Sequence, residues 1–150
     1  MKVGIIMEWL KHIINYPKLE LSTLQFANKE RLKCNNNICI FDEVGTGKTI
    51  SAGIIILESI CNKKIKNPLN NKNVLIITTE LGKVSFCSDY GITEKGIIDT
   101  NNNKAKLPFK EIMENIDSIN IRVINNYYTN IEKEINKNWG IVVIDEAHLF

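Results

Sequence analysis

The chain has little of several residue types that mark particular protein classes. Its 150 residues include only 3 prolines and 2 histidines, and its 4 cysteines form no C-x-x-C pair. The spacings therefore complete no zinc pattern, which disfavours a metal–thiolate site. Cys39 lies in an apolar run and Cys61 near the end of an expected helix. Reduced, buried thiols are common at such positions and are the favoured interpretation.

Long apolar runs and a strong net charge are also absent. No apolar run approaches the ~20 residues that a membrane span requires. Residues 3–7 are apolar, but Glu8 follows at once, so they are too short for a signal peptide. A cytoplasmic protein without a membrane partner is therefore expected. The 19 basic and 17 acidic residues leave a net charge of +2, which indicates no overall commitment to nucleic acid.

What the chain does contain is an alternation of apolar strands with helical segments. Strands are predicted at residues 38–41, 74–78, 119–124 and 141–144, and helices at 49–62, 109–116 and 129–138. The interval 80–118 otherwise carries a weak signal, interrupted by Gly82, Gly91 and Gly96. Asparagine-rich stretches at 35–37, 70–71 and 101–103 are interpreted as solvated loops. This alternation predicts an α/β fold whose mostly parallel sheet is covered on both sides.

Two amphipathic segments, at about 3–14 and 21–33, precede the first strand. Few basic residues flank them, so packing against a core is favoured over a membrane surface. A chain of this length has room for one domain with a core of its own. We therefore expect a helical extension at 1–18, whose helix Pro17 ends, and a single lobe at 19–150.

Residues 42–49, Asp-Glu-Val-Gly-Thr-Gly-Lys-Thr, follow an expected strand and open an expected helix, the context of a phosphate-binding loop. The two glycines let backbone N–H groups point toward phosphate oxygens, and the helix adds its positive end. Lys48 is expected to reach the β- and γ-phosphates of ATP, and the Thr49 hydroxyl to bind Mg²⁺. The nucleotide-contacting residues of this loop are Gly45, Thr46, Gly47, Lys48 and Thr49.

A second motif, Asp145-Glu146, directly follows the apolar strand at 141–144. A carboxylate at the tip of a buried strand can hold Mg²⁺, so Asp145 is the expected metal ligand. Glu146 is expected to orient and deprotonate the attacking water. The alternative is a solvated strand end, which the four preceding apolar residues and the following Ala147 disfavour. The two motifs together predict an ATP hydrolysis site.

At these residues the chain resembles a known family. Residues 42–53, DEVGTGKTISAG, look like motif I of the SWI/SNF-like ATPases of helicase superfamily two, most closely their bacterial branch. In that family aspartate opens the loop, as Asp42 does here. Residues 139–148, WGIVVIDEAH, resemble the DEAH-type motif II of the same family. The resemblance covers about 19–150 and implies a three-layer RecA-like P-loop lobe, incomplete at its C-terminus.

The resemblance also implies roles and partners. Gln25 is similar to a glutamine that lies near the adenine, with a plain surface glutamine as the alternative. His148 would couple the nucleotide site to nucleic acid, or is simply a polar residue after the strand. The implied partners are DNA, rather than RNA, and a second RecA-like lobe. Arg122 lies in an expected strand, whereas the family's arginine finger comes from that second lobe.

Two departures from the family pattern argue against particular nucleic-acid contacts. The segment after the strand at 74–78 lacks the family's proline, and Asn126 stands in place of a threonine before Tyr127. Contact with DNA through these two places is therefore not expected.

The sequence predicts the ATP-binding lobe of a nucleic-acid-dependent ATPase, which hydrolyses ATP when a second lobe complements it. A nucleotide-binding module without turnover is one alternative, because an arginine finger contributes about 10³–10⁵ in rate. A fragment of a restriction-system or phage helicase is another, since Thr46 suits that group. Because the sequence stops at Phe150, the isolated chain is expected to be nearly inactive and marginally stable.

Overall fold

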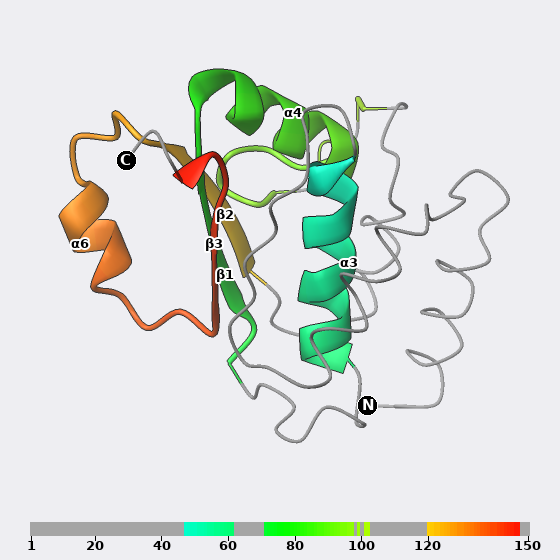
Figure 1. Ribbon diagram of the computed structural model, residues 1–150, viewed down its shortest axis with the longest axis horizontal. Coiled ribbons are helices and arrows are strands. Elements are labelled where there is room, and N and C mark those ends of the chain that lie inside the picture. The colour runs from blue at the N-terminus through cyan, green and yellow to red at the C-terminus, as the bar shows by residue number, and fades with distance from the viewer. Residues whose placement is uncertain (1–46, 62–70, 98, 100, 103–119, 148–150) are drawn as a thin grey trace, which may run out of the picture. The chain divides into compact units, whose positions relative to one another are not determined.

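The computed structural model describes residues 47–61, 71–97, 99, 101–102 and 120–147 (Figure 1). The chain divides into two compact units, Met1–Leu69 and Asn70–Phe150. The expected helices at 3–14, 21–33 and 109–116, and the expected strand at 38–41, lie outside the described residues. The division into an extension at 1–18 and a lobe at 19–150 remains a prediction. No helix in the described part is long and apolar enough to cross a bilayer.

In the first unit the structure describes helix α3 (Lys48–Cys61). It begins directly after Gly47, whose φ of 81° is readily adopted by glycine because it has no Cβ. The carbonyl of Gly47 accepts the first helical hydrogen bonds, from the amides of Ile50 at 3.0 Å and Ser51 at 3.1 Å. The helix predicted at 49–62 is therefore confirmed within one residue at each end.

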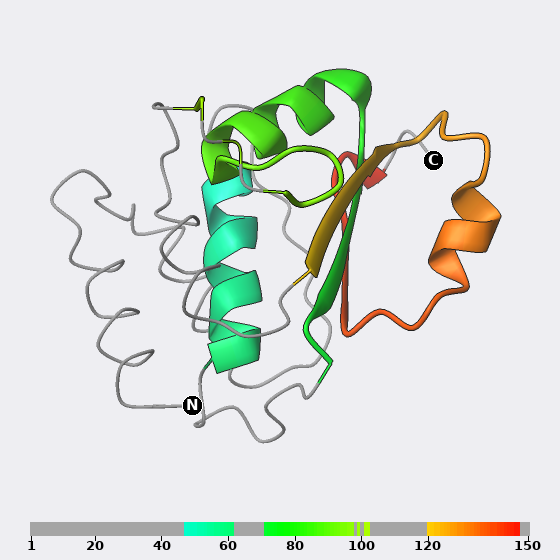
Figure 2. The ribbon, with the colours of Figure 1, turned by 180° about the vertical axis from the view of Figure 1, so that it is seen from behind.

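The second unit contains a parallel sheet of strands β1 (Asn73–Thr78), β2 (Asn120–Asn125) and β3 (Ile141–Ile144). Their order is β2-β1-β3, so β1 is central, with Val74 opposite both Ile121 and Ile141. Figure 2 shows the three strands side by side. From Val74 to Thr78 every residue of β1 is buried, as a central parallel strand requires. The predicted strands and the parallel α/β arrangement are thereby confirmed for the described residues.

Helix α4 (Glu80–Tyr90) covers one face of this sheet and was not predicted. The Thr79 hydroxyl caps its start by accepting the Gly82 amide at 3.1 Å, and Gly91 ends it at φ 66°. Phe86 and Tyr90, four residues apart, are both buried and meet edge to face with ring centroids 5.4 Å apart. The sequence showed little sign of regular structure at 80–118, and for residues 80–90 that interpretation was wrong. Gly82 lies in the first turn of α4 and Gly91 ends it, so these glycines do not interrupt the helix.

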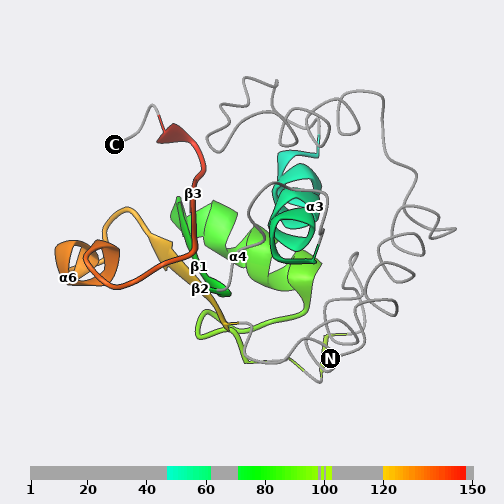
Figure 3. The ribbon, with the colours of Figure 1, turned by 90° about the horizontal axis from the view of Figure 1, so that it is seen from below.

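Helix α6 (Ile131–Ile135) lies on the opposite side of the strands from α4 (Figure 3). It falls within the helix predicted at 129–138 but is shorter. Three side chains around it pack against a buried cluster of β1 and β2. The three are Tyr128, Ile131 and Trp139, and the cluster is Leu75, Ile77 and Ile124.

A buried carboxylate fastens α6 to the sheet. Glu134 is only 3% exposed, and its Oε1 lies 3.0 Å from Arg122 Nε and 2.8 Å from Lys137 Nζ. The indole N–H of Trp139 donates to the Glu134 carbonyl at 2.6 Å. The Arg122 guanidinium also lies over the Tyr128 ring, 5.6 Å from its centroid. Arg122 thus sits in a strand, as predicted, and supplies the positive charge that a buried carboxylate requires.

The expectation that both faces of the sheet are covered is wrong at β3. Val142 is 49% and Ile144 54% exposed. In the strand pairing, Val142 is opposite Leu75 and Ile144 is opposite Ile77, so all four side chains lie on the same face of the sheet. On this face Tyr128, Ile131 and Trp139 pack against β1 and β2. Those side chains therefore leave the β3 part of this face uncovered.

The asparagine at 71 is a structural residue rather than solvated filler. Its Nδ2 donates to the carbonyl and to Oδ1 of Asn138, at 3.2 and 3.1 Å, and its Oδ1 accepts the Asn73 amide at 3.0 Å. These bonds join the start of β1 to the segment that leads into β3.

Candidate functional site

The order of the strands marks one end of the sheet as a place for ligands. From β1 the chain passes through α4 to β2 on one side, and then returns through α6 to β3 on the other side. The crossover direction therefore reverses between β1 and β3. In open α/β sheets, ligands bind outside the carboxyl ends of the strands at such a reversal.

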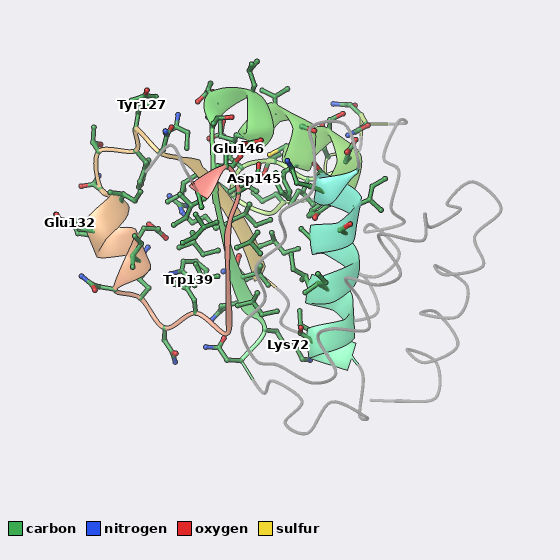
Figure 4. The ribbon with its side chains drawn as sticks, viewed as in Figure 1. Lys72, Tyr127, Glu132, Trp139, Asp145 and Glu146 are labelled. Atoms are coloured by element: carbon green, nitrogen blue, oxygen red, sulfur yellow. The ribbon has the colours of Figure 1, made fainter. Side chains whose placement is uncertain are left out.

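The carboxylate of Asp145 lies at this point. Its amide donates to the carbonyl of Ile77 at 2.9 Å, which continues the sheet one residue beyond β3. Its Oδ2 accepts the hydroxyl of Thr78 at 2.8 Å, and Thr78 is fully buried. Figure 4 shows Asp145 and Glu146 at the end of β3 opposite the end near Lys72. Asp145 is therefore a partly exposed carboxylate held in a defined orientation.

Glu146 has an unusual backbone conformation. Its φ is 54°, and among the described residues it is the one non-glycine residue with a positive φ. The left-handed region costs an ordinary residue about 1–2 kcal/mol. Such strain gathers at functional sites, where the surrounding structure maintains it. The strained residue is thus the one that the sequence predicts to act on water.

The predicted phosphate-binding residues that the structure describes begin α3. Lys48 and Thr49 are its first two residues, directly after the left-handed Gly47. No acidic residue occupies the first turn of α3. The positive end of the helix dipole is therefore not offset within that turn, and a negatively charged group is favoured there.

The predicted site residues are only partly described. Gly47, Lys48 and Thr49 belong to the first unit, and Asp145 and Glu146 belong to the second. The structure brings Asp145 together with Thr78, which was not predicted as a site residue. Predicted residues outside the described part are Gln25, Gly45, Thr46 and His148.

The donor atoms at Asp145 suit a hard cation. Within the described ranges no three His, Cys, Asp or Glu side chains gather into a metal-binding group. Magnesium in nucleotide sites is held by one or two carboxylates together with phosphate oxygens and water. An oriented, partly exposed carboxylate such as that of Asp145 fits this requirement.

Tyr90 is a buried phenol whose pKa is affected by its burial and by the charge of Asp145. Burial raises the pKa of its phenol well above its usual range, and the negative charges of Asp89 and Asp145 raise it further. The phenol therefore stays protonated at physiological pH and cannot serve as a base.

The Cys87 thiol on α4 is expected to react slowly with alkylating reagents. The pKa of Cys87 is raised to about 11, mainly by burial of the thiol and also by the negative charge of Glu94. Because the thiolate is the reactive form, alkylation at pH 8 should be roughly 100-fold slower than for an unshifted thiol. The rate should rise about tenfold per pH unit until pH approaches the pKa.

This expectation is measured as iodoacetamide labelling in a variant whose Cys34, Cys39 and Cys61 are replaced by alanine. The same variant in concentrated urea is the control, and its rate should level off near pH 9. A rate that levels off near pH 9 in the folded protein as well would contradict the raised pKa.

Comparison with known proteins gives one curated match. The chain is 30% identical over 154 residues to the early transcription factor 70 kDa subunit of Molluscum contagiosum virus subtype 1. The alignment covers 99% of this chain and 22% of that viral protein, so the chain spans about a fifth of its relative's length. No family model matches the chain, and no solved structure matches it.

Proposed function

We propose that the chain is the ATP-binding, RecA-like lobe of a nucleic-acid-dependent ATPase, which hydrolyses ATP when a second lobe complements it. The observation that carries the proposal is the oriented carboxylate of Asp145 at the carboxyl end of β3, where the strand order reverses. The phosphate-loop sequence ending in Lys48 and Thr49 at the start of a helix supports it independently. The parallel α/β sheet is compatible with such a lobe.

Each proposed role follows from the chemistry of the side chain. Lys48 contacts the β- and γ-phosphates as a point charge. By its place in the loop motif the Thr49 hydroxyl would be one Mg²⁺ ligand, and the Asp145 carboxylate would be another; the cation would neutralise charge on the phosphate oxygens. Glu146 orients the attacking water and accepts its proton. The sequence motifs and the family resemblance further assign phosphate binding to loop residues 45–47, adenine contact to Gln25 and coupling to nucleic acid to His148.

The proposed nucleic acid is DNA rather than RNA. The likeness of residues 42–53 and 139–148 to motifs of SWI/SNF-like helicases supports this. The viral relative is a transcription factor subunit by its name, which is compatible with work on a DNA template. Because the chain spans 22% of that relative, movement along DNA belongs to the proposal only together with the second lobe.

A nucleotide-binding module without turnover is the second candidate, and one observation favours it. Arg122, the one arginine among the described residues, is engaged with Glu134 and Tyr128 within the second unit. It is therefore not available as an arginine finger, and lack of a finger lowers hydrolysis by about 10³–10⁵. Hydrolysis by the 150-residue chain that DNA clearly stimulates would refute this candidate.

The test of nucleotide binding is thermal stabilisation of the chain by Mg²⁺·ATP. Lys48→Ala should weaken ATP binding about 10- to 100-fold, because one charge-assisted hydrogen-bonding group is lost. Lys95→Ala, in an exposed turn of the second unit, is the matched control and should bind as the native chain does. An ATP-induced shift that survives Lys48→Ala unchanged would overturn the proposal.

A further inference from the structure

Thr78 places a hydroxyl at the end of a run of four apolar residues. It closes the buried run Val-Leu-Ile-Ile-Thr of β1 and has no exposed surface. Valine has nearly the same shape, so packing alone does not require the oxygen atom. A buried hydroxyl does require a partner, and this one donates to Asp145 Oδ2 at 2.8 Å.

Neighbouring elements fix the position of this hydroxyl. In the first turn of α4, a Cβ added at Gly82 would lie 2.0 Å from Thr78 Oγ1, so glycine leaves the space that the hydroxyl occupies. On the other side, the Thr78 carbonyl accepts the amide of Asn126 at 2.9 Å, just beyond β2. The backbone of Thr78 is therefore anchored beside β2, and Gly82 leaves room for the hydroxyl that donates to Asp145.

We infer that Thr78 is a positioning residue for magnesium binding, acting through the carboxylate of Asp145. Its O–H occupies Oδ2 and fixes the rotation of the carboxylate, which leaves Oδ1 to meet the cation. This inference rests on the proposed function, in which Asp145 is a magnesium ligand. Partners that orient a metal ligand in this way typically contribute about 10- to 100-fold to metal affinity.

The experiment compares Thr78→Val, which removes the hydroxyl and keeps the shape, with Thr78→Ser, which keeps the hydroxyl. ATP binding to the 150-residue chain is followed with a fluorescent ATP analogue, in EDTA and across a Mg²⁺ titration. Thr78→Val should raise the Mg²⁺ concentration at half-saturation about 10- to 100-fold and leave binding in EDTA unchanged. Thr78→Ser should stay within about threefold of the native chain, because the donor remains.

Gly82→Ala supplies a second route to the same defect. Its methyl group must displace the Thr78 hydroxyl, so the Mg²⁺ requirement should rise although Thr78 itself is unchanged. If Thr78→Val does not fold, as judged by circular dichroism, Gly82→Ala and Thr78→Ala carry the test.

The outcomes separate this inference from the proposed function. If Asp145→Asn abolishes Mg²⁺-dependent binding while the folded Thr78 and Gly82 variants bind normally, the inference is overturned and the proposed function stands. A loss of equal size in EDTA and in Mg²⁺ also overturns it, because the hydroxyl would then serve only the fold. If the native chain shows no Mg²⁺-dependent ATP binding, the inference about Thr78 and the proposed function are both contradicted.

Discussion

Replacing Asp145 by asparagine is expected to remove the Mg²⁺-dependent part of ATP binding. Asparagine keeps the size of the side chain and can still accept the Thr78 hydroxyl, but it lacks the negative charge that Mg²⁺ prefers. Loss of an orienting partner alone costs about 10- to 100-fold in metal affinity, so loss of the ligand itself should cost at least about 100-fold. Titration calorimetry with ATP, in EDTA and in Mg²⁺, measures the difference.

The matched control is Glu132→Gln, which removes one negative charge from an exposed position on α6 (Figure 4). That variant should bind Mg²⁺·ATP as the native chain does, because a distant surface charge is screened by salt. Retention of the full magnesium effect by Asp145→Asn would exclude Asp145 as the ligand and remove the main support for the proposed site.

The elements that the sequence predicted well are those with a clear apolar pattern. β1, β3 and α3 carry continuous apolar runs, whereas β2 alternates apolar residues with Asn120 and Arg122. Helix α4 was not predicted because only Phe86 and Tyr90 are buried along its length. Two buried residues are too few to produce a recognisable helical pattern of apolar side chains. Its glycines looked like interruptions, although Gly82 gives the Thr78 hydroxyl room and Gly91 ends the helix.

The candidate site was predicted at Asp145 but not at its partner. Thr78 could have been found from the pairing of the strands, because Ile77 stands opposite Ile144 and the next residues are therefore neighbours. That register is a long-range property, which local patterns in one sequence do not specify. The strained backbone of Glu146 was equally hidden, since nothing in the residue type demands a positive φ.

Gly96→Ala is expected to be the most damaging single substitution in the second unit. Gly96 has a φ of 77°, and a Cβ there would lie 2.0 Å from the backbone oxygen of Ile121 in β2. The turn cannot move aside freely, because the neighbouring Glu94 carbonyl accepts the Val123 amide at 3.0 Å. Backbone strain and overlap together should cost about 3–5 kcal/mol of unfolding free energy. The melting temperature should fall by about 10 °C, as measured by circular dichroism.

Two substitutions calibrate that result. Lys95→Ala changes the adjacent exposed residue of the same turn and should leave stability within about 0.5 kcal/mol of the native chain. Gly140→Ala would bring a Cβ within 1.9 Å of the Asn71 carbonyl oxygen but carries no positive-φ penalty. It should therefore be harmful but less so than Gly96→Ala. A native-like melt of Gly96→Ala would show that the turn relaxes at little cost.

The central place of β1 has a consequence for how the second unit forms during synthesis. The ribosome makes β1 before both of its neighbours, and Thr78 emerges 67 residues ahead of Asp145. Until β3 arrives, the buried strand lacks one of its two hydrogen-bonding partners. Contacts over such long separations form slowly, because the intervening chain must first be ordered. The bond between Thr78 and Asp145 therefore cannot form before β3 has been synthesised, and the carboxylate acquires its fixed orientation only once β3 pairs with β1.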